Sequence, residues 1–263
     1  MKEQSIKFKS INVSFTDHGK GKAVVLLHGF LENQSIWKYF SEQLSKTQRV
    51  ITVDLLGHGN TDCLSYVHTM EEMAEAVQAV LNHLKIRKYF LVGHSLGGYV
   101  SLALAEVQPD HVKGLVLFHS TAKADTKSKK ADRNRAIKVV KRNATIFIKE
   151  AIPNLFNTEY KPYKRGINTI SKQALKMSKQ GVIAALEGMK VRLDREIILK
   201  FAPYPVLYII GKRDNILPYE NLIEQAKLTK NGEFILLDKV GHMGFLEAKE
   251  ETCKVIKWFV AKH

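Results

Sequence analysis

The stretch Gly93-His94-Ser95-Leu96-Gly97-Gly98 constrains the fold of this chain more than any other part of its sequence. It follows the apolar run Tyr89-Phe90-Leu91-Val92 and precedes the amphipathic segment 99–105, an order that predicts a strand, a tight turn with one serine, and a helix. Glycines at positions 93 and 97 allow strand and helix to approach closely while the serine takes a strained backbone conformation. A helix N-terminus behind Ser95 would direct N–H groups toward a developing anion. The alternative is a helix that merely begins with a serine near its N-cap.

Strand and helix patterns alternate along most of the chain. Residues 5–16 alternate apolar and polar side chains, which predicts two short antiparallel strands joined near Ser10. Further strands are predicted at 23–27, 50–53, 115–118, 206–210 and 234–237, with helices at 36–46, 70–84 and 245–262. From residue 121 to about 200 the strands stop and a basic helical pattern replaces them. The expected fold is therefore α/β, with a parallel, helix-covered sheet in residues 1–120 and 201–263 and a helical cap in residues 121–200.

The distribution of charge bears on possible partners. The net charge of +15 over 263 residues would favour nucleic acid if it were spread over the whole protein. However, residues 121–200 hold 20 of the 41 Lys and Arg residues and 7 of the 26 Asp and Glu residues. No aromatic or base-reading motif accompanies this excess. We expect a solvated basic face on the cap and no nucleic-acid partner.

Other features of the sequence bear on location and cofactors. The first residues, 1–5, contain no apolar core of a signal peptide, and no apolar run is long enough to cross a membrane. No membrane partner is expected. Cys63 and Cys253 lie in different segments without a metal-ligand pattern, which favours a cytoplasmic protein. No Walker, GxGxxG or HExxH motif occurs, so neither a cofactor nor a metal is expected.

A serine nucleophile requires a base that removes its proton. Where the acid and the base both follow the serine along the chain, the candidates are His111, His119, His242 and His263. His263 is the last residue, His111 opens the strand after the Ser95 helix at the wrong edge of the sheet, and His119 has no strand-end acid between it and Ser95. His242 follows the last strand in a loop flanked by glycines, which can reach the serine. The sequence therefore predicts His242 as the base.

The acid that orients the base is predicted from strand ends. Asp214 follows the strand 206–210 directly. Asp238 also follows a strand, but it lies four residues before His242 and is poorly placed to orient that ring from the opposite side. Residues 119–121, after another candidate strand, contain no acid. The prediction is Asp214, against the alternative of a turn-forming aspartate.

An oxyanion hole needs two backbone N–H groups that converge on one point. Leu96 supplies one, since it directly follows the nucleophile. Phe30 supplies the second, because His28-Gly29-Phe30 ends a neighbouring buried strand and Gly29 leaves the loop free to turn its amide inward. Residues that bind the rest of the substrate are left open.

With these residues in place, the chain resembles the α/β-hydrolase superfamily from end to end. The motifs that carry the resemblance occur in the family's order: Leu27-His28-Gly29-Phe30, Asp54-Leu55-Leu56-Gly57-His58-Gly59, Gly93–Gly98, Gly211-x-x-Asp214 and Gly241-His242. Leu56 departs from the proline of many relatives. The resemblance implies a mostly parallel eight-stranded sheet, helices on both faces, and a helical cap after the sixth strand, as in small cytoplasmic bacterial serine hydrolases. It also implies Ser95 as nucleophile, Asp214 as acid, His242 as base, and the Phe30 and Leu96 amides as the oxyanion hole.

The leading hypothesis is a cofactor-free serine hydrolase that cleaves a small carboxylic ester, lactone or thioester through an acyl-enzyme. The same triad could instead serve carbon–carbon bond hydrolysis or elimination, as in meta-cleavage hydrolases or the menaquinone-pathway synthase that resembles this fold. A non-catalytic binding protein of the same fold is the third alternative, and the presence of all three triad residues argues against it. The sequence leaves the identity of the small-molecule substrate and the oligomeric state open.

The cap contains one strongly patterned segment at residues 129–152. Its apolar side chains fall near one helical face and are expected to roof the pocket: Ile137, Val140, Ala144, Phe147 and Ala151. Its basic side chains are expected around the mouth: Arg133, Arg135, Lys138, Lys141 and Arg142. Because a field of one sign attracts opposite charge, this pattern predicts a preference for anionic esters.

Overall fold

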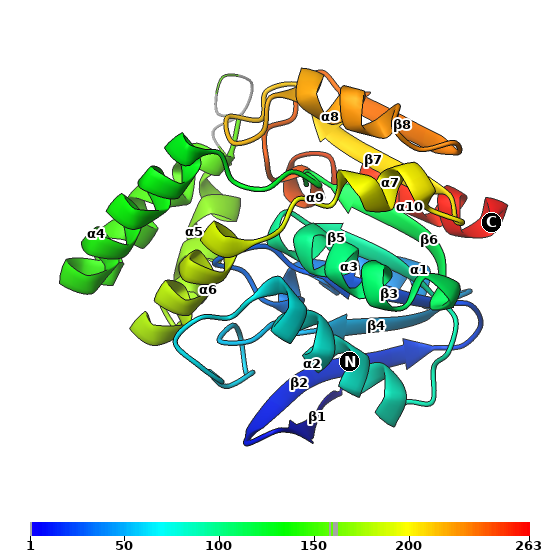
Figure 1. Ribbon diagram of the computed structural model, residues 1–263, viewed down its shortest axis with the longest axis horizontal. Coiled ribbons are helices and arrows are strands. Elements are labelled where there is room, and N and C mark those ends of the chain that lie inside the picture. Colours follow the sequence, from blue (N-terminus) through cyan, green and yellow to red (C-terminus); the bar gives the residue numbers. More distant parts are fainter. Residues whose placement is uncertain (1, 158, 160–162) are drawn as a thin grey trace.

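One eight-stranded sheet lies at the centre of the computed structural model, which describes residues 2–157, 159 and 163–263 (Figure 1). In spatial order the strands are β1 (Glu3–Phe8), β2 (Ile11–Gly19), β4 (Arg49–Val53), β3 (Ala23–Leu27), β5 (Tyr89–His94), β6 (Val112–Phe118), β7 (Val206–Gly211) and β8 (Gly232–Leu237). Strand β2 pairs antiparallel with β1 and β4, and the remaining pairs are parallel. The predicted mostly parallel sheet and the N-terminal antiparallel pair are confirmed.

Helices cover both faces of the sheet. The face toward the viewer in Figure 1 carries α2 (Met70–His83), α3 (Leu96–Val107), α7 (Glu196–Phe201) and α8 (Tyr219–Ala226). Behind the sheet lie α1 (Lys38–Leu44), which extends the short helix η1 (Gln34–Trp37), and α10 (Lys249–Lys262). Every residue of β3, β5 and β7 is buried, as expected for apolar strands enclosed between two helical layers. A further short helix, η2 (Pro109–His111), leads into β6, so that His111 lies directly before the strand that it was predicted to open.

The chain between β6 and β7 is helical among its described residues. It forms α4 (Lys127–Ala151), η3 (Pro153–Leu155), α5 (Lys164–Ala174), α6 (Lys179–Val191) and then α7. Helices α4, α5 and α6 stand together beside the sheet, whereas α7 packs on the sheet near α3 and α8 (Figure 1). The division into a core and a cap at residues 121 and 200 stays a prediction.

Two helices predicted as continuous are interrupted. Helix α4 breaks at Asn143, whose backbone lies at φ −155 and ψ 95, and the Asn143 side chain accepts a hydrogen bond from the Ile146 N–H group (3.1 Å). A short polar side chain that bonds nearby backbone competes with the helical ladder, which explains the break. Ala248, at φ −138 and ψ 46, likewise separates α9 (Gly244–Glu247) from α10.

Candidate active site

Ser95 occupies the turn between β5 and α3, in a backbone conformation of φ 48 and ψ −112. The turn is tight enough that a Cβ atom at Gly93 would overlap the Gly97 backbone, and one at Gly97 would overlap the Leu27 carbonyl. Two hydrogen bonds fix the serine backbone: its N–H donates to the Phe118 carbonyl (3.0 Å), and Ser120 Oγ donates to its carbonyl (2.8 Å). The sheet therefore holds Ser95 in a strained position with its hydroxyl exposed to the cavity described below.

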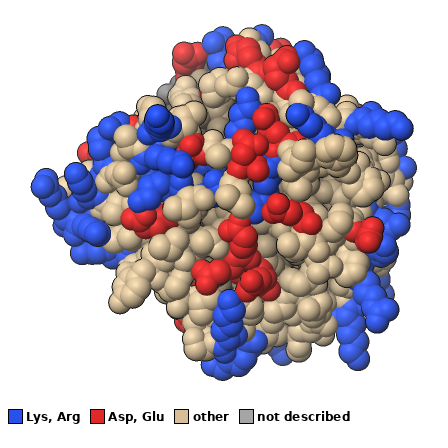
Figure 2. Space-filling model, in the orientation of Figure 1, with Lys and Arg blue, Asp and Glu red and all other residues tan. Residues whose placement is uncertain are grey.

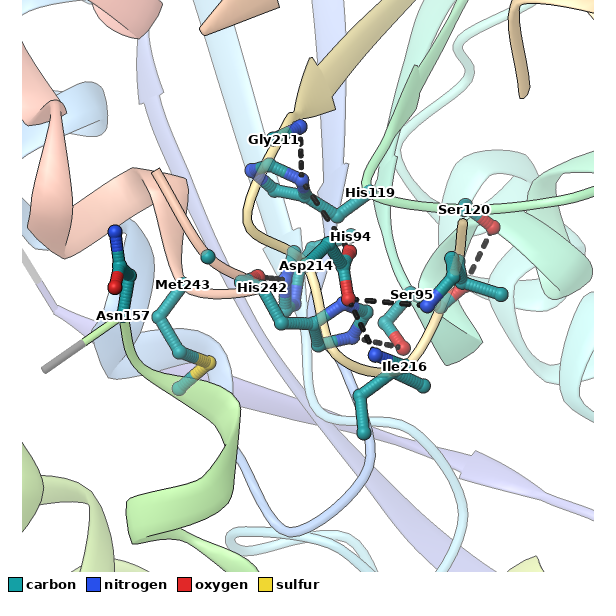
Figure 3. A network of polar contacts seen from close by, with 12 residues as sticks. His94, Ser95, His119, Ser120, Asn157, Gly211, Asp214, Ile216, His242 and Met243 are labelled. Atoms are coloured by element: carbon teal, nitrogen blue, oxygen red, sulfur yellow. Dashed lines mark hydrogen bonds and ion pairs between the residues drawn. The ribbon is translucent and has the colours of Figure 1, made fainter. Parts of the chain in front are cut away.

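The three residues predicted as nucleophile, base and acid lie together (Figure 3). His242 Nε2 is 2.9 Å from Ser95 Oγ, and His242 Nδ1 is 2.7 Å from Asp214 Oδ2. The two loops that carry the histidine and the aspartate follow the adjacent strands β8 and β7. The rival acid, Asp238, is exposed and pairs with Lys212. The arrangement is a continuous hydrogen-bonded chain from a hydroxyl through an imidazole to a carboxylate.

The Asp214 carboxylate is fully buried yet ionised. Burial opposes ionisation, but the adjacent His242 ring, together with the Ile216 N–H group on Oδ1 (2.8 Å), holds the pKa of Asp214 below its usual value. Leu217 N–H also donates to Oδ1 (3.1 Å). With Oδ1 occupied, Oδ2 remains to accept the proton on His242 Nδ1, which leaves Nε2 as the nitrogen that faces Ser95.

His119 lies deeper beneath the same carboxylate. Its Nδ1 accepts the Gly211 N–H group (3.1 Å) and lies 3.7 Å from Asp214 Oδ2. Complete burial lowers the pKa of His119 well below its usual value, so the ring is neutral. Sequence reasoning set His119 aside as the base, and the structure places it in contact with the Asp214 side of the chain, away from Ser95.

A buried pair that the sequence did not reveal lies on the other side of His242. His94 Nδ1 is 3.0 Å from Glu32 Oε2, and His94 Nε2 is 2.9 Å from the carbonyl oxygen of His242. Glu32 Oε2 also accepts the Gly29 N–H group (2.6 Å). His94 stands next to the serine in the sequence, which gave a faint signal, but nothing in the sequence pointed to Glu32, 62 positions away.

Other contacts hold the loop of His242. Its N–H group donates to the Leu155 carbonyl (2.8 Å), which connects the loop to the helical segment between β6 and β7. Glu247 accepts from the N–H groups of Gly241 and Met243 (both 3.0 Å). Burial raises the pKa of Glu247 despite these bonds.

The two N–H groups predicted to form the oxyanion hole belong to Phe30 and Leu96. Phe30 follows β3, and Leu96 begins α3. Within the described part of the chain, neither N–H group has a hydrogen-bond acceptor. The loop before Phe30 is fixed, because His28 Nε2 accepts the Leu55 N–H group (3.0 Å). Each of these two N–H groups can therefore donate to a bound molecule.

Residues 22–249 match the family of the alpha/beta hydrolase fold. The chain belongs to the α/β-hydrolase family. Several of its relatives are named as esterases or hydrolases, and this α/β-hydrolase is accordingly an enzyme of the hydrolase class.

Three relatives illustrate the match. The structure of a thermophilic esterase from Thermogutta terrifontis, with malate bound, has a TM-score of 0.93, 31% identity, and coverage of 100% of this chain and 99% of that one. A dihydrolipoyllysine-residue acetyltransferase component of an acetoin cleaving system from Pseudomonas putida is 29% identical over 92% of this chain, which spans 64% of that protein's length. A putative 2-succinyl-6-hydroxy-2,4-cyclohexadiene-1-carboxylate synthase from Bacillus subtilis (strain 168) is 27% identical over 91% of this chain and 90% of that protein.

The α/β-hydrolase has a cavity of about 320 Å³ to which Ser95 and His242 contribute. Its walls are largely apolar: Phe30, Leu31, Ala136, Phe147, Ala151, Leu155, Leu186, Met189 and Ile216. Of the apolar α4 face predicted to roof the pocket, Phe147 and Ala151 line it, whereas Ile137, Val140 and Ala144 lie outside its lining. The charged residues of its lining are Glu32, Lys129, Asp132 and Arg133.

Basic side chains cluster over α4 in the space-filling view (Figure 2). Of the basic residues expected around the mouth, Arg133 lines the cavity, while Arg135, Lys138, Lys141 and Arg142 lie outside its lining. Among the described residues, none of the helices could span a membrane, and no cluster of three or more His, Cys, Asp or Glu side chains could hold a metal ion.

Proposed function

We propose that this α/β-hydrolase cleaves a small carboxylic ester, lactone or thioester through an acyl-enzyme on Ser95. The observation that carries the proposal is the chain of hydrogen bonds from Ser95 Oγ through His242 to Asp214, placed beside a cavity. A hydroxyl that is hydrogen-bonded to an oriented imidazole is the arrangement that activates serine as a nucleophile.

In the proposed reaction, Ser95 Oγ attacks the carbonyl carbon as its proton passes to His242 Nε2. The N–H groups of Phe30 and Leu96 donate to the oxyanion of the tetrahedral intermediate. When the bond to the leaving oxygen or sulfur breaks, His242 returns the proton to the leaving group. A water molecule, deprotonated by His242, then releases the acid and restores Ser95. Asp214 stabilises the imidazolium in both halves and accepts no proton itself.

The size and lining of the cavity support a small substrate with an apolar part, and the related esterase supports an ester bond. The alternative, carbon–carbon cleavage or elimination with the same residues, is favoured by the related synthase of the cyclohexadiene carboxylate. No cofactor takes part in either reaction. We also propose that residues 121–200 act as a cap on a core of residues 1–120 and 201–263, in a cytoplasmic enzyme without a nucleic-acid partner.

The test combines covalent labelling with a substrate series. Wild type should react with a fluorophosphonate probe and hydrolyse 4-nitrophenyl esters of graded acyl length. Ser95→Ala should do neither, and its melting curve should show the cooperative transition of a folded protein. Undiminished labelling of Ser95→Ala would refute the nucleophile. Labelling without hydrolysis of any ester, lactone or thioester would favour the carbon–carbon or elimination alternative.

A further inference from the structure

A second cluster of buried charge borders the cavity, at the first half of α4. Arg133 donates to the Asp125 carboxylate through both Nε and Nη2, the second bond at 3.4 Å. Arg192 Nη1 donates to the same carboxylate (2.6 Å) and to the Met189 carbonyl (3.0 Å). The Arg192 guanidinium also stacks 4.2 Å above the ring of Tyr99, which lines the cavity. Two guanidinium groups are thus fixed by one carboxylate.

The charge of this cluster does not cancel. The side chains of Asp125, Arg192 and Arg133 are 3%, 5% and 18% exposed, and the two guanidinium groups hold the pKa of Asp125 below its usual value even though burial opposes ionisation. No other carboxylate of the described residues lies within ion-pair distance of either arginine. One positive charge is left over in a site with little access to water, where an unpaired charge is costly.

Arg133 can present that charge to a ligand. It lines the cavity together with Ser95, and its Nη1 has no acceptor within the described part of the chain. Lys129, one helical turn earlier, lines the same side and donates to the Ile216 carbonyl at 3.4 Å. Both acids of the cavity lining have partners: Asp132 is paired with Arg135, and Glu32 is paired with His94. The local balance therefore favours an anion.

Resting on the proposed function, we infer that Arg133, supported by Lys129, binds a carboxylate carried by the substrate, so that the preferred substrates are esters with a second, anionic group. Because Asp125 already holds the Arg133 guanidinium in place, binding of a ligand costs less side-chain entropy than it would at a free arginine. A guanidinium also binds carboxylates in a defined geometry.

The test uses two substrates that differ in one group: the monomethyl ester of adipic acid, which is anionic at pH 7, and the methyl ester of adipamic acid, which is neutral. Wild type should show a higher kcat/KM for the anionic ester. Arg133→Gln should lower the anionic-to-neutral ratio about tenfold, as expected for loss of a charged hydrogen bond, and Arg133→Lys should lower it less. Arg142→Gln, an exposed arginine of the same helix outside the cavity lining, is the matched control and should keep the ratio.

Equal ratios in wild type and Arg133→Gln, or equal losses in Arg133→Gln and Arg142→Gln, would overturn the inference, the second by showing a diffuse field instead of a contact. Cleavage of the neutral ester and labelling of Ser95 would in that case leave the proposed function standing. If neither ester were cleaved and Ser95 resisted the fluorophosphonate, the proposed function would have failed with it. Melting curves show whether Arg133→Gln is folded.

An independent observation, the Glu32–His94 pair, concerns the machinery itself. The exposed fraction is 0% for the His94 side chain and 1% for the Glu32 side chain. The two ring nitrogens of His94 face oxygens, one of a carboxylate and one of the His242 carbonyl. Because a carbonyl oxygen accepts and cannot donate, Nε2 must carry a proton, and an ionised Glu32 requires a second proton on Nδ1. Burial opposes both charges, yet Glu32 raises the pKa of His94 and His94 lowers that of Glu32, which favours the ion pair.

This pair joins three segments of the site. Glu32 accepts from Gly29, which precedes Phe30, and a Cβ atom at Gly29 would lie 2.7 Å from His94 Nδ1. His94 precedes Ser95 and bonds to the backbone of His242. We propose that Glu32 and His94 are positioning residues, which act through the backbone of Gly29 and His242 and set the place of the His242 imidazole relative to Ser95 and to the Phe30 amide.

Glu32→Ala should lower kcat about tenfold or more while KM changes less than about twofold, since a small misplacement of a base is costly for the reaction and not for binding. Glu32→Gln should recover part of kcat, because an amide oxygen in the place of Oε2 can accept from both Gly29 N–H and His94 Nδ1–H, although it removes the negative charge that faces the ring. The rate of fluorophosphonate labelling should follow kcat across the three proteins. Equal losses in the two variants, or a change in KM alone, would contradict the positioning role, and melting curves would detect unfolding.

Discussion

At the scale of single residues, the backbone of Ser95 shows that the site costs stability. A serine at φ 48 and ψ −112 lies in a region that glycine tolerates far better, and such strain costs on the order of 1–3 kcal/mol. The hydrogen bonds from Ser120 and to Phe118 keep the strained turn in place. The backbone conformation that costs stability is therefore the one that places the Ser95 hydroxyl beside His242.

Ser95→Gly should therefore raise the free energy of unfolding by about 1 kcal/mol while activity is lost. Ser95→Ala keeps the Cβ atom and the strain, and its stability should stay close to that of wild type. Chemical denaturation of the three proteins measures the difference. A glycine variant no more stable than the alanine variant would show that the turn is not strained in solution.

Asp214 provides a second prediction at this scale. Asp214→Asn should lower kcat by up to about 10⁴-fold, because the imidazole loses its tautomer preference and its counter-charge. Asp238→Asn removes an exposed partner of Lys212 and should change kcat little. Steady-state rates on one aryl ester compare the two. The reverse result would identify Asp238 as the acid.

At the scale of elements, the apolar runs and turn signals of the sequence predicted the strands and the tight turn at Ser95 because each is a local pattern. The places of Asp214 and His242 near Ser95 could be predicted for the same reason, since each lies in the loop that follows a strand. Glu32 could not, because its role depends on packing against His94 from a distant part of the chain. The break at Asn143 also escaped prediction, since its side chain can point to solvent in a continuous helix or bond the backbone, and only the folded chain decides.

Helix α6 depends on close contact with the loop before α2. The His68 N–H group donates to the Ala184 carbonyl (3.0 Å), and a Cβ atom at Gly188 would overlap the His68 carbonyl. Gly188→Ala should destabilise the protein by about 2 kcal/mol or more, because backbone must move. Gly166→Ala in α5, where a Cβ atom would make ordinary contacts at 3.4 Å, is the control and should be neutral or stabilising by up to about 1 kcal/mol. Equal melting temperatures for the two variants would contradict this packing.

At the scale of the whole molecule, buried charge is arranged in partnered groups around the cavity. Asp125, Asp214 and Glu32 are each paired with cations or histidines, and each has a pKa below its usual value. Asp54 and Glu247 are exceptions, with pKa values raised by burial. The paired carboxylates make stability depend on pH, and the two exceptions oppose them.

A carboxyl group with a lowered pKa in the folded state binds fewer protons there than in the unfolded chain. Its contribution to the free energy of unfolding is complete above the pKa of the unfolded chain and is lost as the pH falls through the pKa of the folded protein. The free energy of unfolding should therefore decrease below about pH 5. Asp125→Asn should show a shallower decrease over the same range, although it is less stable at pH 7. Denaturant titrations at pH 7, 5 and 4 measure both slopes. Parallel slopes would mean that Asp125 is not ionised by its arginines.

The path of the chain between β6 and β7 has a further consequence. These strands are parallel neighbours in the sheet, paired from Leu115 with Val206 to Phe118 with Ile209, so the helical segment leaves at the carboxyl end of β6 and returns at the amino end of the adjacent strand β7. A segment anchored in this way can be exchanged or diversified as one cassette while the strands that carry Ser95, Asp214 and His242 keep their register. Enzymes that share this core can thus acquire new substrates through changes confined to one continuous stretch of the gene.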